Sequence, residues 1–331
     1  MISQALEKKL LQLNKSDEIN HLELIQGVWG GYGQLIRVSF SQGVHKSLVI
    51  KLINTPQPNR HPKGWNTAIS HQRKLNSYQI ESYWYQHYAN KLQQTDCRVP
   101  RCLWIDQSER QQVLVLEDLS VAGFPRVKKH CSLTEAKTCL SWLAQFHVIH
   151  LQKKPAGLWP TGSYWHLATR PDELHVLQDK ALKKAAISLD QCLAQTPYQT
   201  LIHGDAKLAN FCFSENGEQV AAVDFQYVGQ GCGMKDVILF ISSAVIPEHC
   251  AQLAPILVDH YFEALQKATV NTEFNGQQLT DAWRPLYAIA WADFQRFVKG
   301  WSPNHWKIND YTETLTLQAL DSLTELNKLE G

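Results

Sequence analysis

The sequence predicts an α+β protein built from two lobes, and three observations support this prediction. Short apolar runs separated by glycine-bearing turns fill the first third of the chain. Long segments with helical periodicity fill most of the remainder. The chain has 331 residues, which is enough to bury two smaller cores. We therefore expect an N-terminal lobe over residues 1–118 and a larger, mostly helical lobe over residues 119–331.

The N-terminal lobe is predicted to be an antiparallel β-sheet with one main helix. An amphipathic helix over residues 3–13 comes first, with its leucines on one side. The main helix covers residues 71–91 and follows a Pro-rich, basic loop. Alternating or continuous apolar runs predict five strands, at residues 22–25, 35–40, 47–53, 101–106 and 112–117.

The C-terminal lobe is predicted to be helical, with one β-hairpin among its helices. After the acidic end of the run Val113–Leu119 the chain loosens, and we interpret this point as the hinge between the lobes. Helical periodicity then predicts five helices, over residues 134–150, 172–195, 248–268, 280–299 and 311–329.

Charge and composition exclude several classes of partner. The chain carries 32 Lys and Arg against 31 Asp and Glu, so nothing favours binding to nucleic acid or to a membrane surface. No run approaches the roughly 20 apolar residues that span a bilayer, and the first ten residues carry charges where a signal peptide is apolar. We expect a cytoplasmic protein with no obligate protein partner. The eight cysteines are scattered without metal-ligand spacing, so a structural zinc site is not expected.

The most informative stretch is His203-Gly-Asp-Ala-Lys-Leu-Ala-Asn210, followed by Asp224 at the end of a second apolar run. Phosphoryl transfer from a nucleotide needs one carboxylate to accept a hydroxyl proton, and an Asn and a second carboxylate to hold Mg²⁺. The spacing predicts Asp205 as the catalytic base and Asn210 and Asp224 as the metal ligands. The alternative is a hairpin whose Asp and Asn residues only form turns.

Two neighbours of the base have less specific predictions. Lys207 could neutralise charge on the transferred phosphoryl group, or could be an ordinary solvated lysine. His203 is predicted to brace the loop through hydrogen bonds rather than to carry a proton. Gly204 is predicted to allow a backbone conformation or a close approach that a side chain would block.

The N-terminal lobe supplies candidate nucleotide-binding residues. Lys51 is the only charge within an apolar strand, and a buried lysine needs a partner. We expect it to contact the α- and β-phosphates of ATP and to pair with Glu81 of the main helix. The turn upstream is rich in glycine, and backbone N–H groups near Gly30, Gly31 and Gly33 could approach phosphates. Such a turn could also only connect two strands.

With these residues in hand, the chain resembles the protein-kinase-like small-molecule phosphotransferases. These include the aminoglycoside phosphotransferases, the choline kinases and, most closely, the ecdysteroid-kinase-like (choline-kinase-like) group. The resemblance covers residues 27–236 in order, and its motifs are Val115–Leu119, His203–Asp205 and Val223–Gln226. It implies a two-lobed protein-kinase-like fold with ATP bound between the lobes.

The resemblance also implies further roles. Backbone groups near Glu117 to Leu119 would contact adenine, and Asp236 would brace the catalytic loop. Two departures matter. Gln226 stands where a protein kinase has the Gly of Asp-Phe-Gly, so the backbone has less freedom for a flipping switch. The glycine-rich turn does not follow the protein-kinase pattern closely, which leaves the phosphate-contacting glycine open.

The short segment after Asp224 favours a small-molecule alcohol as the acceptor. Only 11 residues separate Asp224 from Asp236, which leaves no room for the peptide platform and Ala-Pro-Glu motif of a protein kinase. Choline-like, sterol-like and sugar-like acceptors all remain open. A run of C-terminal aromatic residues could line the acceptor site or could only pack in the core. They are Trp283, Tyr287, Trp291, Phe294, Trp301 and Trp306. The competing hypothesis is a catalytically inactive, kinase-like nucleotide-binding or scaffold protein.

Overall fold

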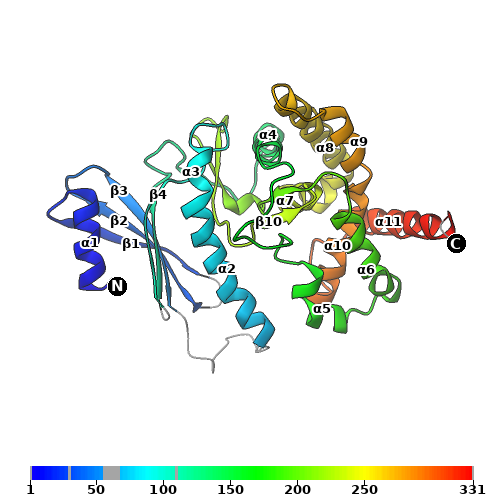
Figure 1. The fold of residues 1–331 in the computed structure, drawn as a ribbon, viewed down its shortest axis with the longest axis horizontal. Coiled ribbons are helices and arrows are strands. Elements are labelled where there is room, and N and C mark those ends of the chain that lie inside the picture. The colour runs from blue at the N-terminus through cyan, green and yellow to red at the C-terminus, as the bar shows by residue number, and fades with distance from the viewer. Residues whose placement is uncertain (1, 29–30, 55–67, 109–110, 330–331) are drawn as a thin grey trace. The chain divides into compact units, whose positions relative to one another are not determined.

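The computed structural model describes residues 2–28, 31–54, 68–108 and 111–329, and its contacts divide the chain into two compact units (Figure 1). The N-terminal unit comprises Met1–Arg126 and Cys212–Val223. The C-terminal unit comprises Val127–Phe211 and Asp224–Gly331. The N-terminal unit therefore extends past residue 118, and it also takes a β-hairpin that the sequence assigned to the other lobe.

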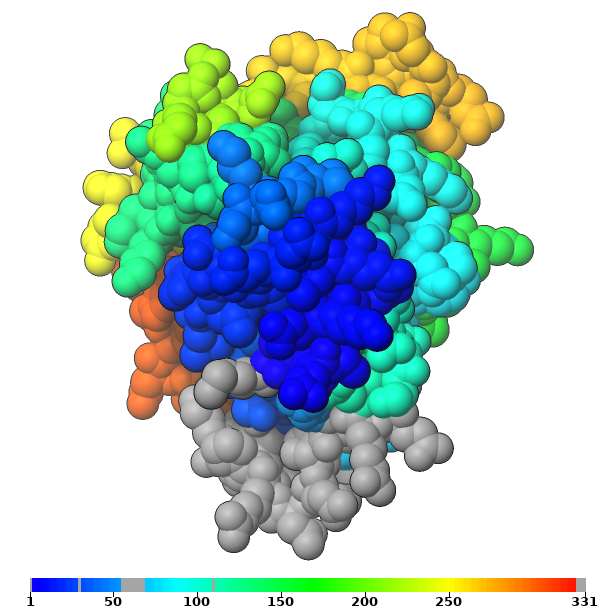
Figure 2. All heavy atoms as spheres, turned by 90° about the vertical axis from the view of Figure 1, so that its left-hand side faces the viewer, coloured from blue at the N-terminus to red at the C-terminus, as the bar shows by residue number. Residues whose placement is uncertain are grey.

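The N-terminal unit contains the predicted antiparallel sheet, with all five predicted strands present. Its spatial order is β1-β2-β3-β5-β4. The strands are β1 (Ile19–Val28), β2 (Gly33–Phe40), β3 (Ser47–Asn54), β4 (Cys102–Gln107) and β5 (Gln111–Glu117). Strand β3 is central, and its Lys51 lies opposite Leu35 of β2 and Leu114 of β5. Edge strand β1 is mostly exposed, and with α1 (Gln4–Asn14) it forms the dark blue surface in Figure 2.

Helices cover both faces of this sheet (Figure 1). The side chain of Ser3 accepts a hydrogen bond from the Leu6 N–H and caps α1, whose Leu6 and Leu10 pack on the sheet core. The predicted second helix is present as α2 (Ala68–His87), followed by a separate short turn, α3 (Ala89–Leu92). Successive side chains of a strand point to opposite faces of the sheet. Ile50 therefore packs in the core that includes α1, and Lys51 points to the opposite face, toward α2.

The C-terminal unit is mostly helical, as predicted. Its helices are α4 (Leu133–Ile149), α5 (Pro171–Val176), α6 (Lys180–Ala194), α7 (Met234–Ala244), α8 (Pro247–Thr269), α9 (Gly276–Trp283), α10 (Leu286–Trp301) and α11 (Asp310–Leu329). A short antiparallel pair joins β7 (Thr200–Ile202) to β10 (Gly229–Gly231). A further sheet, most of whose residues belong to the N-terminal unit, has the order β6-β8-β9, from β6 (Arg126–Val127), β8 (Phe211–Phe213) and β9 (Val220–Ala222). Two 3₁₀ turns cover Leu167–Thr169 and Leu208–Asn210.

Three predictions for this unit were wrong in detail. The helix predicted over residues 172–195 is two helices, because the Asp179 carboxylate accepts the Leu182 N–H and starts α6 anew. The helix predicted over residues 280–299 is interrupted near Pro285, which lacks an N–H for a continuous helix. Helix α7 was not predicted, because it is short, buried nearly all round and apolar along most of its length.

No helix in the described part of the chain is long and apolar enough to cross a bilayer.

Candidate active site

The loop after β7 brings three of the predicted residues together within the C-terminal unit. The carboxylate of Asp205 accepts hydrogen bonds at its Oδ2 from Lys207 Nζ at 2.8 Å and from Asn210 Nδ2 at 3.2 Å. Asn210 Nδ2 also donates to the Asp205 carbonyl at 2.8 Å, and the 3₁₀ turn Leu208–Asn210 makes this approach possible. These two hydrogen bonds hold Oδ2 of Asp205 in place. The residue is 7% exposed, so a small part of it remains accessible to solvent.

The charge of Asp224 acts on Lys207, the lysine that contacts Asp205. Burial by itself would lower the pKa of Lys207, but the nearby charges of Asp205 and Asp224 raise it above its usual value. Both carboxylates therefore act on one ammonium group. Asp224 has a φ of 69°, a left-handed conformation that Asp tolerates better than most residues. Its Oδ1 accepts a hydrogen bond from Gln226 Nε2 at 2.7 Å, which orients the carboxylate.

The loop that contains Asp205 is anchored by Asp236 at the start of α7. This carboxylate is fully buried and accepts hydrogen bonds from the N–H groups of His203 at 2.6 Å and Gly204 at 2.9 Å. His147 Nε2 lies 3.2 Å from the same carboxylate. The buried His203 ring accepts the Asp205 N–H at its Nδ1, at 3.2 Å. These contacts are the kind expected of residues that hold a loop rather than react.

Gly204 has both of the features predicted for it. Its φ is +77°, and a Cβ added there would lie 2.1 Å from the Tyr227 carbonyl oxygen. We expect Gly204→Ala to lower the free energy of unfolding by about 2–3 kcal/mol, through backbone strain and a forced shift of the neighbouring segment. Denaturant unfolding measures this loss. Gly123→Ala is the matched control, since Gly123 has a φ of +99° but open space around its Cβ. Equal losses in the two variants would contradict the assigned close contact.

The N-terminal unit contains the predicted ion pair between strand and helix. Lys51 Nζ donates to Glu81 Oε1 at 2.9 Å and Oε2 at 2.7 Å, and both residues are buried. A buried pair is stabilised only when the geometry is good, and here one ammonium bridges both carboxylate oxygens. The sequence prediction that these two residues pair is therefore confirmed, and their role toward a nucleotide stays a prediction.

The glycine-rich turn gives a mixed result. Gly30 lies outside the described residues. Gly31 has a φ of +78° and open space around its Cβ position, which fits a turn. Gly33 begins β2, and a Cβ there would lie 2.0 Å from the Leu52 carbonyl oxygen. Close packing against β3 thus explains Gly33 without a phosphate.

The segment that the resemblance assigns to adenine is already partly occupied by internal contacts. The Glu117 N–H donates to the Arg101 carbonyl at 2.8 Å, and the Leu119 carbonyl accepts the Phe124 N–H at 2.8 Å. The carboxylate of Glu117 forms ion pairs with the guanidinium groups of Arg98 and Arg101. Burial would raise the pKa of Glu117, but the hydrogen bonds from Arg98 and Arg101 outweigh it and lower the pKa. The side chain of Glu117 therefore has a structural function at the end of β5.

The predicted aromatic run divides into core and surface. Trp283, Trp291 and Phe294 are almost completely buried, so for these three the core-packing interpretation is correct. Trp301 is 41% exposed and Trp306 is 51% exposed. Large exposed tryptophans are uncommon, and these two lie at the end of α10 and in the segment that follows it.

Sequence reasoning missed two residues beside the base. Tyr164 is partly buried, and its pKa is raised by burial and by the charge of Asp205. The charges of Asp205 and Lys207 also act on Lys307, which follows α10. No motif marks either residue, because each lies far from the catalytic loop in the sequence.

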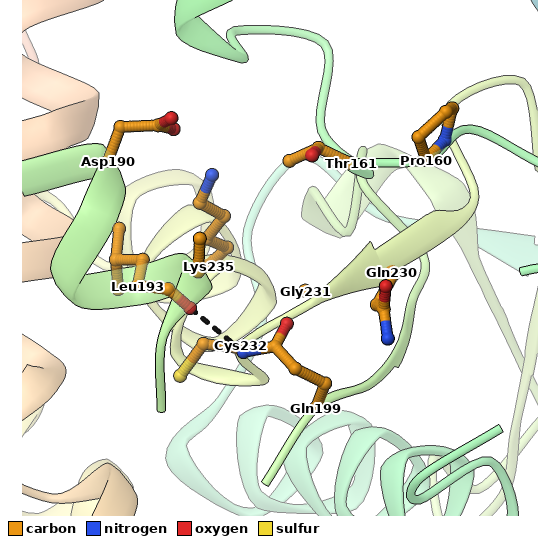
Figure 3. A pocket seen from close by; sticks show the side chains of 10 residues that line it. Pro160, Thr161, Asp190, Leu193, Gln199, Gln230, Gly231, Cys232 and Lys235 are labelled. Carbon is orange, nitrogen blue, oxygen red and sulfur yellow. Dashed lines mark hydrogen bonds between the residues drawn. The ribbon is translucent and has the colours of Figure 1, made fainter. Parts of the chain in front are cut away.

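A hollow elsewhere in the C-terminal unit is lined by none of the residues described above as catalytic or metal-binding (Figure 3). Lys235 of α7 and Asp190 of α6 extend into its wall beside Thr161. Lys235 Nζ lies 3.6 Å from the buried Asp293 carboxylate, so its charge has a partner within the protein. The hollow therefore gives no reason to place a ligand there.

Comparisons with known proteins agree with this fold. The sequence profile of the phosphotransferase enzyme (APH) family matches residues 37–269. The structure is similar to an ethanolamine kinase from Plasmodium vivax, with a TM-score of 0.52 and 16% identity over 95% of this chain and 87% of that one. It is also similar to the choline kinase LicA from Streptococcus pneumoniae, with a TM-score of 0.48 and 15% identity over 97% and 98% of the two chains. No curated protein matches. At such low identity the ethanolamine kinase shows the shared protein-kinase-like fold alone.

Proposed function

Because this chain belongs to the phosphotransferase enzyme family, we propose that it is an ATP- and Mg²⁺-dependent kinase that phosphorylates a hydroxyl of a small molecule. One observation carries the proposal. The Asp205 carboxylate is fixed by Lys207 and Asn210, and the ammonium that fixes it also lies in the field of Asp224. Phosphoryl transfer requires a positioned base, metal ligands and a cation in such an arrangement.

The chemistry follows from these contacts. Asp205 takes the proton of the acceptor hydroxyl as the hydroxyl oxygen bonds to the γ-phosphorus. The bond between that phosphorus and the bridging oxygen breaks at the same time, and ADP leaves. Lys207 offsets negative charge beside the base. Since Lys207 and Asn210 both contact Oδ2 of Asp205, we assign proton transfer to its Oδ1.

The residues fit a magnesium ion. Asn210 uses its Nδ2 to hold Asp205, which leaves the amide oxygen as the group that would bind a cation. With a carboxylate of Asp224 this gives a set of hard oxygen donors. The described residues contain no cluster of three His, Cys, Asp or Glu side chains, and Mg²⁺ needs none, because phosphate oxygens and water complete its coordination. When bound, the ion would neutralise charge on the phosphates.

Nucleotide binding is assigned to the N-terminal unit. Lys51, held by Glu81, is the candidate for the α- and β-phosphates. The adenine contact is assigned to backbone groups of the segment Glu117–Leu119 other than the Glu117 N–H and the Asp118 and Leu119 carbonyls, which have partners. Lys51, Asp205, Asn210 and Asp224 are all present, which argues against an inactive scaffold.

A magnesium titration tests the function. We expect Asp224→Asn to raise the Mg²⁺ concentration for half-maximal turnover at least tenfold, because the variant loses a charged oxygen ligand. The measurement is ADP release with a panel of metabolite alcohols, supported by calorimetry of Mg²⁺ and ATP binding. Asp321→Asn, an exposed change on α11, is the control. Absence of nucleotide binding in the wild type, or turnover that needs no divalent ion, would overturn the proposal.

A further inference from the structure

Lys307 is held rigidly between two helices of the C-terminal unit. Its carbonyl accepts hydrogen bonds from Gln295 Nε2 of α10 at 3.0 Å and from Thr312 Oγ1 of α11 at 3.2 Å. Its N–H donates to His305 Nδ1 at 3.1 Å. These three hydrogen bonds fix the backbone of Lys307, and so they fix the point from which its side chain extends.

Within the described part of the chain, the ammonium of Lys307 has no acidic partner. Nζ donates to Ser242 Oγ of α7 at 3.0 Å and lies over the rings of Phe294 at 5.4 Å and Trp306 at 5.6 Å. Among the residues that the structure describes, no carboxylate lies within 4.0 Å of it. Burial lowers the pKa of Lys307 to about 8, against the attraction of Asp205 and together with the repulsion of Lys207. Partly buried lysines are usually paired with a carboxylate, and the hydrogen bond to Ser242 and the two ring contacts leave this positive charge without one.

The same ammonium faces the catalytic loop. Ser242 and Ser243 are neighbours near the end of α7. Ser242 Oγ accepts the hydrogen bond from Lys307 Nζ. Ser243 Oγ accepts a hydrogen bond from the Leu208 N–H of the catalytic loop at 2.8 Å. The charge of Asp205 also acts on Lys307, so the hydrogen bonds and the electrostatics both indicate that Lys307 lies near this loop. Lys307 and the loop thus contact two consecutive serines of one helix, and Lys307 lies within the electrostatic reach of Asp205.

The surroundings select the charge of such a molecule. The ammonium of Lys207 is paired with Asp205 and lies in the field of Asp224, whereas Lys307 makes no ion pair among the described residues. A cationic acceptor would be repelled by Lys307, whose ammonium already lies over the rings of Phe294 and Trp306. An anionic group would provide the partner that Lys307 lacks, at a site where a partly desolvated charge pair is strong.

We propose that Lys307 is a specificity residue that binds an anionic group of the acceptor, so that the substrate is a hydroxylated small molecule bearing a carboxylate or a phosphate. This inference rests on the proposed kinase function. It concerns the acceptor only, and it assigns Lys307 no part in binding the nucleotide.

The test uses matched alcohols that differ in one substituent: neutral, carboxylate, phosphate or trimethylammonium. With the wild-type protein and Mg-ATP, we expect kcat/KM for the anionic members to exceed that for their neutral and cationic counterparts at least tenfold. The better of the two anions identifies the group. A preference for neutral or cationic members would overturn the inference and leave the kinase function standing.

Two variants separate recognition from folding. Lys307→Met keeps the apolar stem and removes the charge, and we expect KM for anionic acceptors to rise about 10- to 100-fold, with KM for ATP and kcat/KM for neutral alcohols nearly unchanged. Lys307→Arg should restore part of the preference. The thermal midpoint of Lys307→Met should equal or exceed that of the wild type, because an unpaired charge is removed. Equal losses for every alcohol, with a lower midpoint, would show a structural role instead.

A binding measurement covers the case in which no member of the panel is phosphorylated. Calorimetry with the same compounds, in the presence of Mg²⁺ and ADP, should give tighter binding of the anionic members to the wild type than to Lys307→Met. Lys299→Met is the matched control, since Lys299 is a neighbouring lysine of α10 that is paired with Asp179 and Glu313. Anion binding that is unchanged by Lys307→Met would exclude the proposed site, whatever the fate of the kinase proposal.

Discussion

Asp205→Asn is expected to lower turnover about 10²- to 10⁴-fold, the range typical of losing a positioned general base. The amide cannot take the hydroxyl proton, yet it keeps the size of the side chain and an oxygen for Lys207. Mg-ATP affinity should stay within a few-fold of the wild type, because Asp205 is assigned to the acceptor. Initial rates of ADP release and calorimetry with Mg-ATP measure the two quantities.

The control for this prediction is Asp281→Asn, a change of the same chemistry on the exposed face of α9. It should leave both turnover and affinity unchanged. If the Asp205→Asn variant turned over as fast as the wild type, Asp205 would not be the catalytic base. A large loss of Mg-ATP affinity would instead move Asp205 into the metal site, beside Asn210, whose amide already contacts it.

Asp236→Ala is expected to have the largest effect on stability. The change removes the acceptor for the buried N–H groups of His203 and Gly204 and for the contact with His147. Leaving a buried donor unpaired costs about 1–3 kcal/mol, so we expect a loss of roughly 3 kcal/mol or more in the free energy of unfolding. Denaturant unfolding followed by tryptophan fluorescence is the measurement, because several tryptophans of this unit are buried.

The matched control is Asp259→Ala, which removes an exposed ion pair with Arg284. Such pairs contribute little, so the change in unfolding free energy should stay below about 1 kcal/mol. Asp236→Asn adds a second comparison: it retains one oxygen acceptor but presents an NH₂ group to the donors, and should be intermediate. If Asp236→Ala were no more destabilising than Asp259→Ala, the anchoring role would be wrong.

The sequence predicted the N-terminal sheet well, because each strand is an apolar run bounded by turn residues. It also predicted the pairing of Lys51 with Glu81, since a single charge on an apolar strand must find a partner on the element that covers that face. It failed where a helix has no polar face, as in α7. It also failed where one residue, Asp179 or Pro285, interrupts an otherwise continuous period.

The sequence by itself determined the chemical groups and the local part of the site. Asp205, Lys207 and Asn210 lie within a single turn of chain, so their spacing alone brings them together. The resemblance had already assigned Asp236 to bracing the loop, and the structure adds the hydrogen bonds by which it does so. Only the tertiary structure decided that the charge of Asp205 acts on Lys307. The physical reason is that burial and pairing depend on which distant segments pack against one another. A lysine gives no sign in the sequence of whether its ammonium will lie in water or beside Ser242 and two aromatic rings, without a carboxylate.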